Sequence, residues 1–338
     1  MVKPRLPGSH RDGETFMDNA PRDRAQQMVP HNMPIKHHGA RTATHVHRRA
    51  AACALLAAAL AAHAQAAEPP PPVSPDVAAA RNELGFSYLL GLGAQSVTYR
   101  EDSQSGVSSK ATSTSPLIVS GALYAINRDF LFSLGNEMTF AGGSATENWT
   151  ATSSTFDGQT LTSRLLQTNG FSLSQSTTSL LAHYRLARDW FLVGGGALHT
   201  QTYKRYDFMQ GPDHAVSLPT DKTVEESTSE VLANIGVALE PGRVRDEQVH
   251  YGLRATLGVP IWSRTDNTQS PGVHFDSTSG FDIGLEGRYS LRVHDGIHVG
   301  LWGQWLNSRR SRTMVGELEL PNNRTTTLSG GLELLWKL

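Results

Sequence analysis

The final seven residues of the chain alternate apolar side chains (Leu332, Leu334, Trp336 and Leu338) with other residues. Side chains that repeat with a period of two lie on one face of a β-strand. Similar alternation recurs at about ten places between residues 83 and 338. A helix would scatter these apolar residues around its circumference, so the pattern predicts an all-β fold.

A secretory signal precedes the predicted strands. Arg48 and Arg49 form its positive end, an apolar run follows over residues 50–62, and an Ala-x-Ala cleavage site closes the signal predicted at 48–66. The apolar run is shorter than the stretch of about 20 residues that a transmembrane helix needs. We therefore expect export of the chain, with any membrane insertion made by strands.

The segments on either side of the signal show no apolar periodicity. Residues 1–47 are polar, and they form either a disordered extension or sequence ahead of a true start at Met28 or Met33. Residues 67–82 are rich in proline, which predicts a stiff periplasmic lead-in. The folded domain is then expected over residues 83–338.

Composition excludes several functional classes. The net charge of −1 gives no reason to expect binding to nucleic acid. The one cysteine, Cys53, lies inside the signal, so the mature chain has no thiol for catalysis, disulfides or metal binding. We expect no cofactor and no bound metal.

The predicted strands are joined by connections that alternate in length. The strands are expected near 83–100, 114–127, 130–146, 175–187, 190–206, 226–240, 248–264, 277–292, 297–310 and 324–338. Short connections carry Asn, Asp or Gly, whereas long ones, of which 147–174 is the longest, are rich in Ser and Thr. This rhythm is typical of an antiparallel up-and-down transmembrane β-barrel with short periplasmic turns and long extracellular loops. Ten strands are predicted, and eight or twelve would follow if a hairpin has been split or missed.

Aromatic residues gather at the ends of the predicted strands. The set beside the short turns predicts a periplasmic girdle of Tyr124, Phe130, Tyr184, Trp190, Tyr251, Tyr289 and Trp336. A second set predicts an outer girdle of Tyr99, Phe140, Tyr203, Trp262 and Trp305. A soluble β-sandwich, the structural alternative, gives no reason for this sorting.

Charges of both signs occupy the face opposite to the apolar one. The residues expected to point into the lumen are Glu137, Arg185, Arg254, Asp282, Glu286, Arg288 and Glu333. Charges in such a place must pair or be hydrated. A barrel of about eight strands is just wide enough for side chains to fill, so ten strands favour a salt-bridged lumen over an open pore. The alternative is a narrow porin-like channel for small solutes.

The signal, the hairpin rhythm, the girdles and the terminal strand resemble those of bacterial outer-membrane β-barrel proteins. The resemblance covers residues 83–338 and implies a place in the outer membrane of a Gram-negative bacterium, in contact with its lipid and lipopolysaccharide. It also implies insertion by the barrel-assembly machinery, which would recognise Leu332, Leu334, Trp336 and Leu338. The usual last residue of that class is Phe, whereas this chain ends with Leu338.

Ten strands is also the number in the omptin family of outer-membrane proteases. That resemblance implies two aspartates facing an Asp-His pair at the extracellular rim, where they activate a water molecule. The candidate catalytic residues are Asp213 with His214 and His274 with Asp276. The opposing Asp-x-Asp pair is missing, because the 147–174 segment contains only Asp157.

Three classes of function therefore stay open. The first is a non-enzymatic surface, adhesion or envelope-integrity protein, with the 147–174 segment as the predicted contact for a surface ligand. The second is the narrow channel. The third is an omptin-like protease or a lipid-modifying hydrolase, which would need a serine beside a histidine and a third orienting group.

Overall fold

The computed structural model describes residues 85–337, apart from residue 128 and residues 241–247. The predicted polar extension, signal and lead-in lie outside the described residues, as does Leu338. Regular structure in the described part is entirely β-strand. That part contains no helix with the length and apolar character to cross a membrane.

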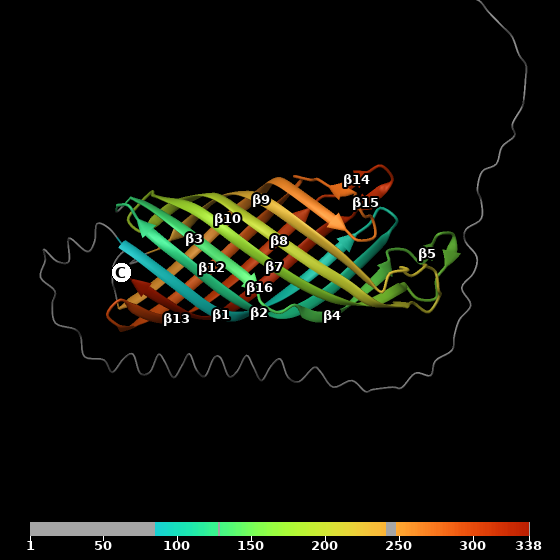
Figure 1. The fold of residues 1–338 in the computed structure, drawn as a ribbon, viewed down its shortest axis with the longest axis horizontal. Helices are drawn as coiled ribbons and strands as arrows, with labels where there is room; N and C mark the ends of the chain where they lie inside the picture. Colours follow the sequence, from blue (N-terminus) through green and yellow to red (C-terminus); the bar gives the residue numbers. More distant parts are fainter. Residues whose placement is uncertain (1–84, 128, 241–247, 338) are drawn as a thin grey trace, which may run out of the picture. The chain divides into compact units, whose positions relative to one another are not determined.

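Ten long strands form a closed antiparallel barrel in the described part of the chain (Figure 1). We call them staves, because one of the ten consists of two consecutive β-strands. They are β1 (Gly85–Asp102), β2 (Val107–Ala125), β3 (Phe130–Thr139) continued by β4 (Gly143–Ala151), β7 (Leu165–Arg185), β8 (Trp190–Gln210), β9 (Thr223–Leu239), β10 (Val249–Asn267), β12 (Gly280–His294), β13 (Ile297–Arg310) and β16 (Asn322–Lys337). Because β3 and β4 both pair with β2 and β7, they count as one stave. Pairing of β1 with both β2 and β16 closes the ring, so the predicted up-and-down barrel of ten strands is confirmed.

Several staves are longer than predicted. The second begins at Val107 and the fourth at Leu165, and short hairpins occupy the connections. These short pieces are β5 (Thr155–Phe156), β6 (Gln159–Thr160), β11 (His274–Phe275), β14 (Thr313–Val315) and β15 (Leu318–Leu320). The prediction of one long loop over 147–174 is wrong, because most of it belongs to β4 and β7. Its outward Ser and Thr residues gave it the composition of a loop, while alternate positions such as Phe171 and Leu173 are buried inside the barrel.

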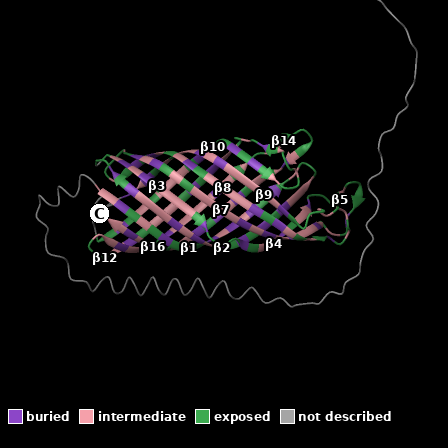
Figure 2. Cartoon of the chain, in the orientation of Figure 1, coloured by how far each residue is buried: buried purple, intermediate pink, exposed green. Residues whose placement is uncertain are grey.

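The outward face of the barrel changes along the staves, although buried and exposed residues alternate throughout (Figure 2). On β1 the outward residues from Phe86 to Ala94 are apolar, whereas those from Ser96 to Asp102 are polar. A transmembrane strand needs only about 9–11 residues. The apolar outward residues thus form a belt of bilayer height. The remaining strand ends form what we call the projection, residues 96–102, 107–114, 143–151, 165–178, 200–210 and 223–229.

The seven residues of the predicted periplasmic girdle lie beside the short turns on outward positions, and Tyr184 is among the most exposed. Two residues of the predicted outer girdle do not face outward. Tyr99 and Tyr203 are buried in the barrel, with exposed fractions of 0% and 1%. That prediction is wrong because Tyr99 stands an odd number of residues from Tyr88, on the opposite face of β1.

Candidate functional site

One group of charged side chains lies on one wall of the lumen, at the level of the apolar belt. Arg254 on β10 forms an ion pair with Glu286 on β12. Arg288 also binds Glu286, at 2.5 Å, and reaches Glu333 on β16. Four residues expected to point into the lumen therefore form one continuous network, which we call the belt-level layer.

Glu137 joins the belt-level layer from the opposite wall. Its carboxylate accepts a hydrogen bond of 3.1 Å from the side chain of Gln304. Cavities of about 70 and 110 Å³ both touch Glu137, Arg254 and Glu286. Spaces of this size and polarity have room for a few water molecules beside the paired charges.

The other two residues expected in that network lie elsewhere. Asp282 pairs at 2.6 Å with Arg310, which also binds Glu230 at 2.6 Å, and these three residues form a second layer nearer the projection. Arg185 ends β7 beside a short turn, where it lies 3.3 Å from Asp129. Its guanidinium carbon also lies 5.2 Å from the ring centre of the buried Phe191, and its membership of the lumen network stays a prediction.

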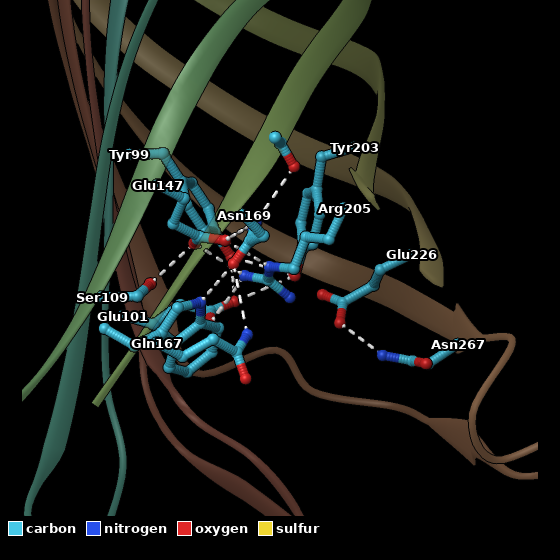
Figure 3. A network of polar contacts seen from close by, with 12 residues as sticks. Tyr99, Glu101, Ser109, Glu147, Gln167, Asn169, Tyr203, Arg205, Glu226 and Asn267 are labelled. Atoms are coloured by element: carbon cyan, nitrogen blue, oxygen red, sulfur yellow. Dashed lines mark hydrogen bonds and ion pairs between the residues drawn. The ribbon is translucent and has the colours of Figure 1, made fainter. Parts of the chain in front are cut away.

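A different cluster fills the interior of the projection, and no predicted site residue belongs to it (Figure 3). Arg205 on β8 binds Glu147 through two nitrogens, at 2.7 and 3.1 Å, and Glu101 at 2.8 Å. The guanidinium carbon lies 4.6 Å from the ring centre of Tyr203 and 5.0 Å from that of Trp149. This planar cation is thus held by two carboxylates and two aromatic rings.

Further hydrogen bonds satisfy the carboxylates of this Arg205 cluster. The hydroxyls of Tyr99 and Tyr203 donate to Glu101 at 2.6 and 3.0 Å. Glu147 accepts from Ser109 at 2.8 Å and from Asn169 at 2.9 Å. Buried charges are costly unless they are paired and hydrogen-bonded, so this arrangement makes the projection rigid.

A third carboxylate, that of Glu226 on β9, borders the cluster (Figure 3). It accepts a hydrogen bond of 2.9 Å from Asn267. Burial and the negative charge of Glu101 raise the pKa of Glu226 to about 7, although Arg205 opposes this shift. Three carboxyl groups therefore lie around Arg205, and one of them, Glu226, is partly protonated near neutral pH.

Asp213 and His214 do not form a catalytic pair. The Asp213 carboxylate accepts backbone N–H bonds from Thr162 and Ser163, at 3.1 and 2.9 Å, and the Thr162 hydroxyl also binds it. His214 instead lies 2.7 Å from the side-chain oxygen of Gln210. Asp213 therefore anchors the segment that follows β6, at the tip of the projection. The same hydrogen bonds hold the pKa of the Asp213 carboxyl below its ordinary value.

The second predicted pair is also not formed. His274 contacts Asp266 and Arg264, both on β10, rather than Asp276. Among the described residues, no hydrogen bond or ion pair links His274 or Asp276 to Asp213 or His214. Neither predicted pair therefore orients its histidine by its own aspartate, because His214 bonds Gln210 and His274 bonds Asp266.

One serine–histidine contact occurs inside the barrel near the periplasmic end. The hydroxyl oxygen of Ser133 lies 2.8 Å from Nε2 of His183, whose Nδ1 is 3.6 Å from Glu240. His183 is fully buried and packs edge-on against Phe191. Since the ring is closed off by the surrounding apolar residues, we interpret this contact as structural.

Two further predictions concern the terminal strand, as a contact for the assembly machinery, and metal binding. Leu332, Leu334 and Trp336 follow one another on the outward face of β16, and their recognition by the assembly machinery stays a prediction. No three potential ligands among the described His, Asp and Glu side chains are arranged to hold a metal ion.

Comparison with known proteins shows what this barrel is similar to. No protein-family model and no curated protein sequence matches the chain. Among solved structures, the outer-membrane protease OmpT from Escherichia coli matches with a TM-score of 0.53 at 8% identity, over 76% of this chain and 97% of that one. The chain thus has the fold of the bacterial outer-membrane β-barrels, while identity this low says nothing about shared activity.

Two further matches belong to the same broad class. The outer-membrane protein OprG from Pseudomonas aeruginosa matches at 8% identity over 76% of this chain and 98% of that one, with a TM-score of 0.31. The translocator domain of the autotransporter NalP from Neisseria meningitidis matches at 9% identity over 84% and 95%, with a TM-score of 0.27.

Proposed function

We propose that this chain is a non-enzymatic barrel of the Gram-negative outer membrane that displays a rigid projection at the cell surface for adhesion. The observation that carries the proposal is the projection itself. Its staves continue well past the apolar belt, and their interior is built around the Arg205 cluster. A barrel that only needed to span the bilayer would not require these extra residues.

The tip of the projection supports the same function. Ala151, Leu161 and Leu166 form a small apolar cluster beneath the β5–β6 hairpin. Asp213 fastens the neighbouring connection to Thr162 from the other side. Rigid elements lose less conformational entropy on binding than flexible loops do, so this tip is suited to contact with another surface.

Exchange of the hairpin tests the proposal. Replacing residues 155–160 by two glycines removes β5 and β6, together with Phe156, which packs against the apolar cluster, but keeps Ala151, Leu161, Leu166 and the bonds of Asp213 to Thr162 and Ser163. Cells that display the wild-type barrel should attach to wells coated with fibronectin, collagen or mucin, or settle faster by self-aggregation. The variant should lose about tenfold in the same assay, while a matched exchange of residues 315–318 in the β14–β15 hairpin should keep it.

Surface display must be verified for all three proteins by protease accessibility on whole cells. Attachment and settling equal to those of cells without the barrel, on every surface of the panel, would contradict the adhesion function. Equal loss in both hairpin exchanges would contradict the assignment of this tip.

A second candidate is the narrow channel, which the cavities on the belt-level layer favour. The space beside the Arg254–Glu286 ion pair is bordered by polar side chains, among them Thr256 and Gln304, as well as by apolar ones. On this candidate, the Arg254→Ala barrel should conduct ions in planar bilayers more readily than the wild type. Silence from both proteins would rule the channel out.

A further inference from the structure

Four basic side chains stand next to one another on the outside of four neighbouring staves. They are Lys110 on β2, Arg100 on β1, Arg324 on β16 and Arg309 on β13. Arg100 is the register partner of both Lys110 and Arg324, and Arg324 is the partner of Arg309. Side chains at opposed positions of adjacent strands lie about 4.5–5.5 Å apart at Cβ, so the four form a continuous basic row.

The basic row has no acidic partner within the described residues. All four side chains are exposed, and none of them makes an ion pair or a side-chain hydrogen bond there. Arg309 alone has an aromatic contact, 5.7 Å from the ring centre of Phe281. Other exposed cations of the wall are paired, as Lys204 is with Glu225 at 2.9 Å. Like charges on opposed positions destabilise a sheet, so the row favours a bound anion.

The row begins just above the apolar belt. Arg309 stands four residues beyond Trp305 on β13, and Arg324 stands four residues beyond Leu328 on β16. At about 3.4 Å per residue and a strand tilt of about 40°, this distance places both guanidinium groups roughly 10 Å above those apolar residues. That height corresponds to the headgroup region of a bilayer. On β1, Arg100 stands six residues beyond Ala94, the last apolar residue of its outward face.

A hollow in the belt adjoins the two staves of the row that carry Arg309 and Arg324. Its volume is about 570 Å³, and Trp305 on β13 and Leu328 on β16 line it on that side. Outward glycines, among them Gly287 and Gly303, leave the wall without side chains there. The hollow and the row therefore lie in line along β13, with an apolar recess below and unpaired cations above.

We propose that the row and the hollow together bind a phosphorylated glycolipid of the outer leaflet, of the lipid A type. Its phosphates would bind Arg309, Arg324 and Arg100, because guanidinium groups match the geometry of phosphate oxygens. One of its acyl chains would fill the hollow beside Trp305. This inference rests on the outer-membrane location in the proposed function but is independent of adhesion.

The test uses the full-length chain folded in detergent micelles, with lipid A, lipid A stripped of both phosphates, and inorganic phosphate as separate probes. Lipid A should raise the melting temperature and appear as a bound adduct in native mass spectrometry. The stripped lipid and inorganic phosphate should do so at least tenfold more weakly. The double variant R100Q/R324Q should lose about 30-fold in lipid A affinity, because each basic residue near a lipid surface contributes about 1 kcal/mol and 1.4 kcal/mol is tenfold.

The control R264Q/K204Q removes the same charge from other staves and should keep the affinity. Without lipid, R100Q/R324Q should melt at least as high as the wild type, because it removes mutual repulsion. Equal binding of lipid A and the stripped lipid, or unchanged affinity of R100Q/R324Q, would overturn the proposal. An equal response to inorganic phosphate would show that free phosphate is the ligand. Each of these results leaves the cell-attachment assay unaffected, so the two proposals fail separately.

Discussion

Two of the charged groups in the lumen, the belt-level layer and the Arg205 cluster, differ in how many arginines bind each carboxylate. In the belt-level layer, Arg254 and Arg288 share Glu286, and Arg288 also holds Glu333. In the projection, Arg205 alone serves Glu101 and Glu147, with Glu226 close by.

This difference determines how much each cluster depends on a single arginine. Loss of one arginine from the belt-level layer leaves Glu286 with another arginine. Loss of Arg205 leaves two buried carboxylates, Glu101 and Glu147, without the cation that binds them. The excess of carboxylates also makes the projection sensitive to pH.

Substitution of Arg205 should give the largest effect. The Arg205→Met barrel should lose about 3–5 kcal/mol of unfolding free energy, the usual result of removing one partner of a buried ion pair. Urea unfolding followed by tryptophan fluorescence in micelles measures the loss. Arg205→Lys keeps the charge but not the two-nitrogen contact with Glu147, and it should be intermediate. An unfolding curve for Arg205→Met that overlays the wild type would show that the cluster does not stabilise the projection.

The pH dependence of stability should come next in size. The pKa of Glu226 is about 7 in the folded protein, above the ordinary carboxyl value of 4.5. The folded state therefore binds more protons than the unfolded state between those values, and stability falls as pH rises from about 4.5 to about 7. The fall is on the order of 3 kcal/mol for a shift of this size.

Glu226→Gln should remove this dependence and make the barrel more stable than the wild type at pH 8. The matched control is Glu225→Gln, which alters the neighbouring outward side chain paired with Lys204. Melting temperatures measured from pH 4 to pH 8 for the wild type and both variants test whether Glu226 causes the pH dependence. A slope that persists in Glu226→Gln but vanishes in another carboxyl variant would assign the proton elsewhere.

The two clusters also differ in how far the sequence predicts them. Arg254, Glu286, Arg288 and Glu333 stand at inward positions of regular apolar strands, so alternation alone indicates their side of the wall. The sequence does not reveal the Arg205 cluster, because Ser and Thr replace the apolar outward residues beyond the belt. In that region small polar residues alternate with buried ones, so no apolar period of two marks the inward positions.

A period-two pattern cannot predict which side chains form ion pairs across the lumen. Arg205 on β8 meets Glu101 on β1, and these staves are not neighbours in the sheet. Which inward charges meet depends on the register and shear of the closed barrel. The position of Tyr99 was predictable from its parity with Leu89 on β1, whereas its bond to Glu101 required the closed structure.

Substitution within the belt-level layer should give the smallest effect. Arg254→Met should cost roughly 1–2 kcal/mol, because Glu286 keeps its bond to Arg288 and the adjoining cavity admits water. The same urea unfolding assay measures it, with Arg288→Met as the comparison that breaks contacts to both Glu286 and Glu333. If Arg254→Met were as damaging as Arg205→Met, redundancy would not explain the contrast between the clusters. If Arg254→Met and Arg288→Met were equal, the shared position of Arg288 between two carboxylates would have no energetic consequence, and the layer would act as separate pairs.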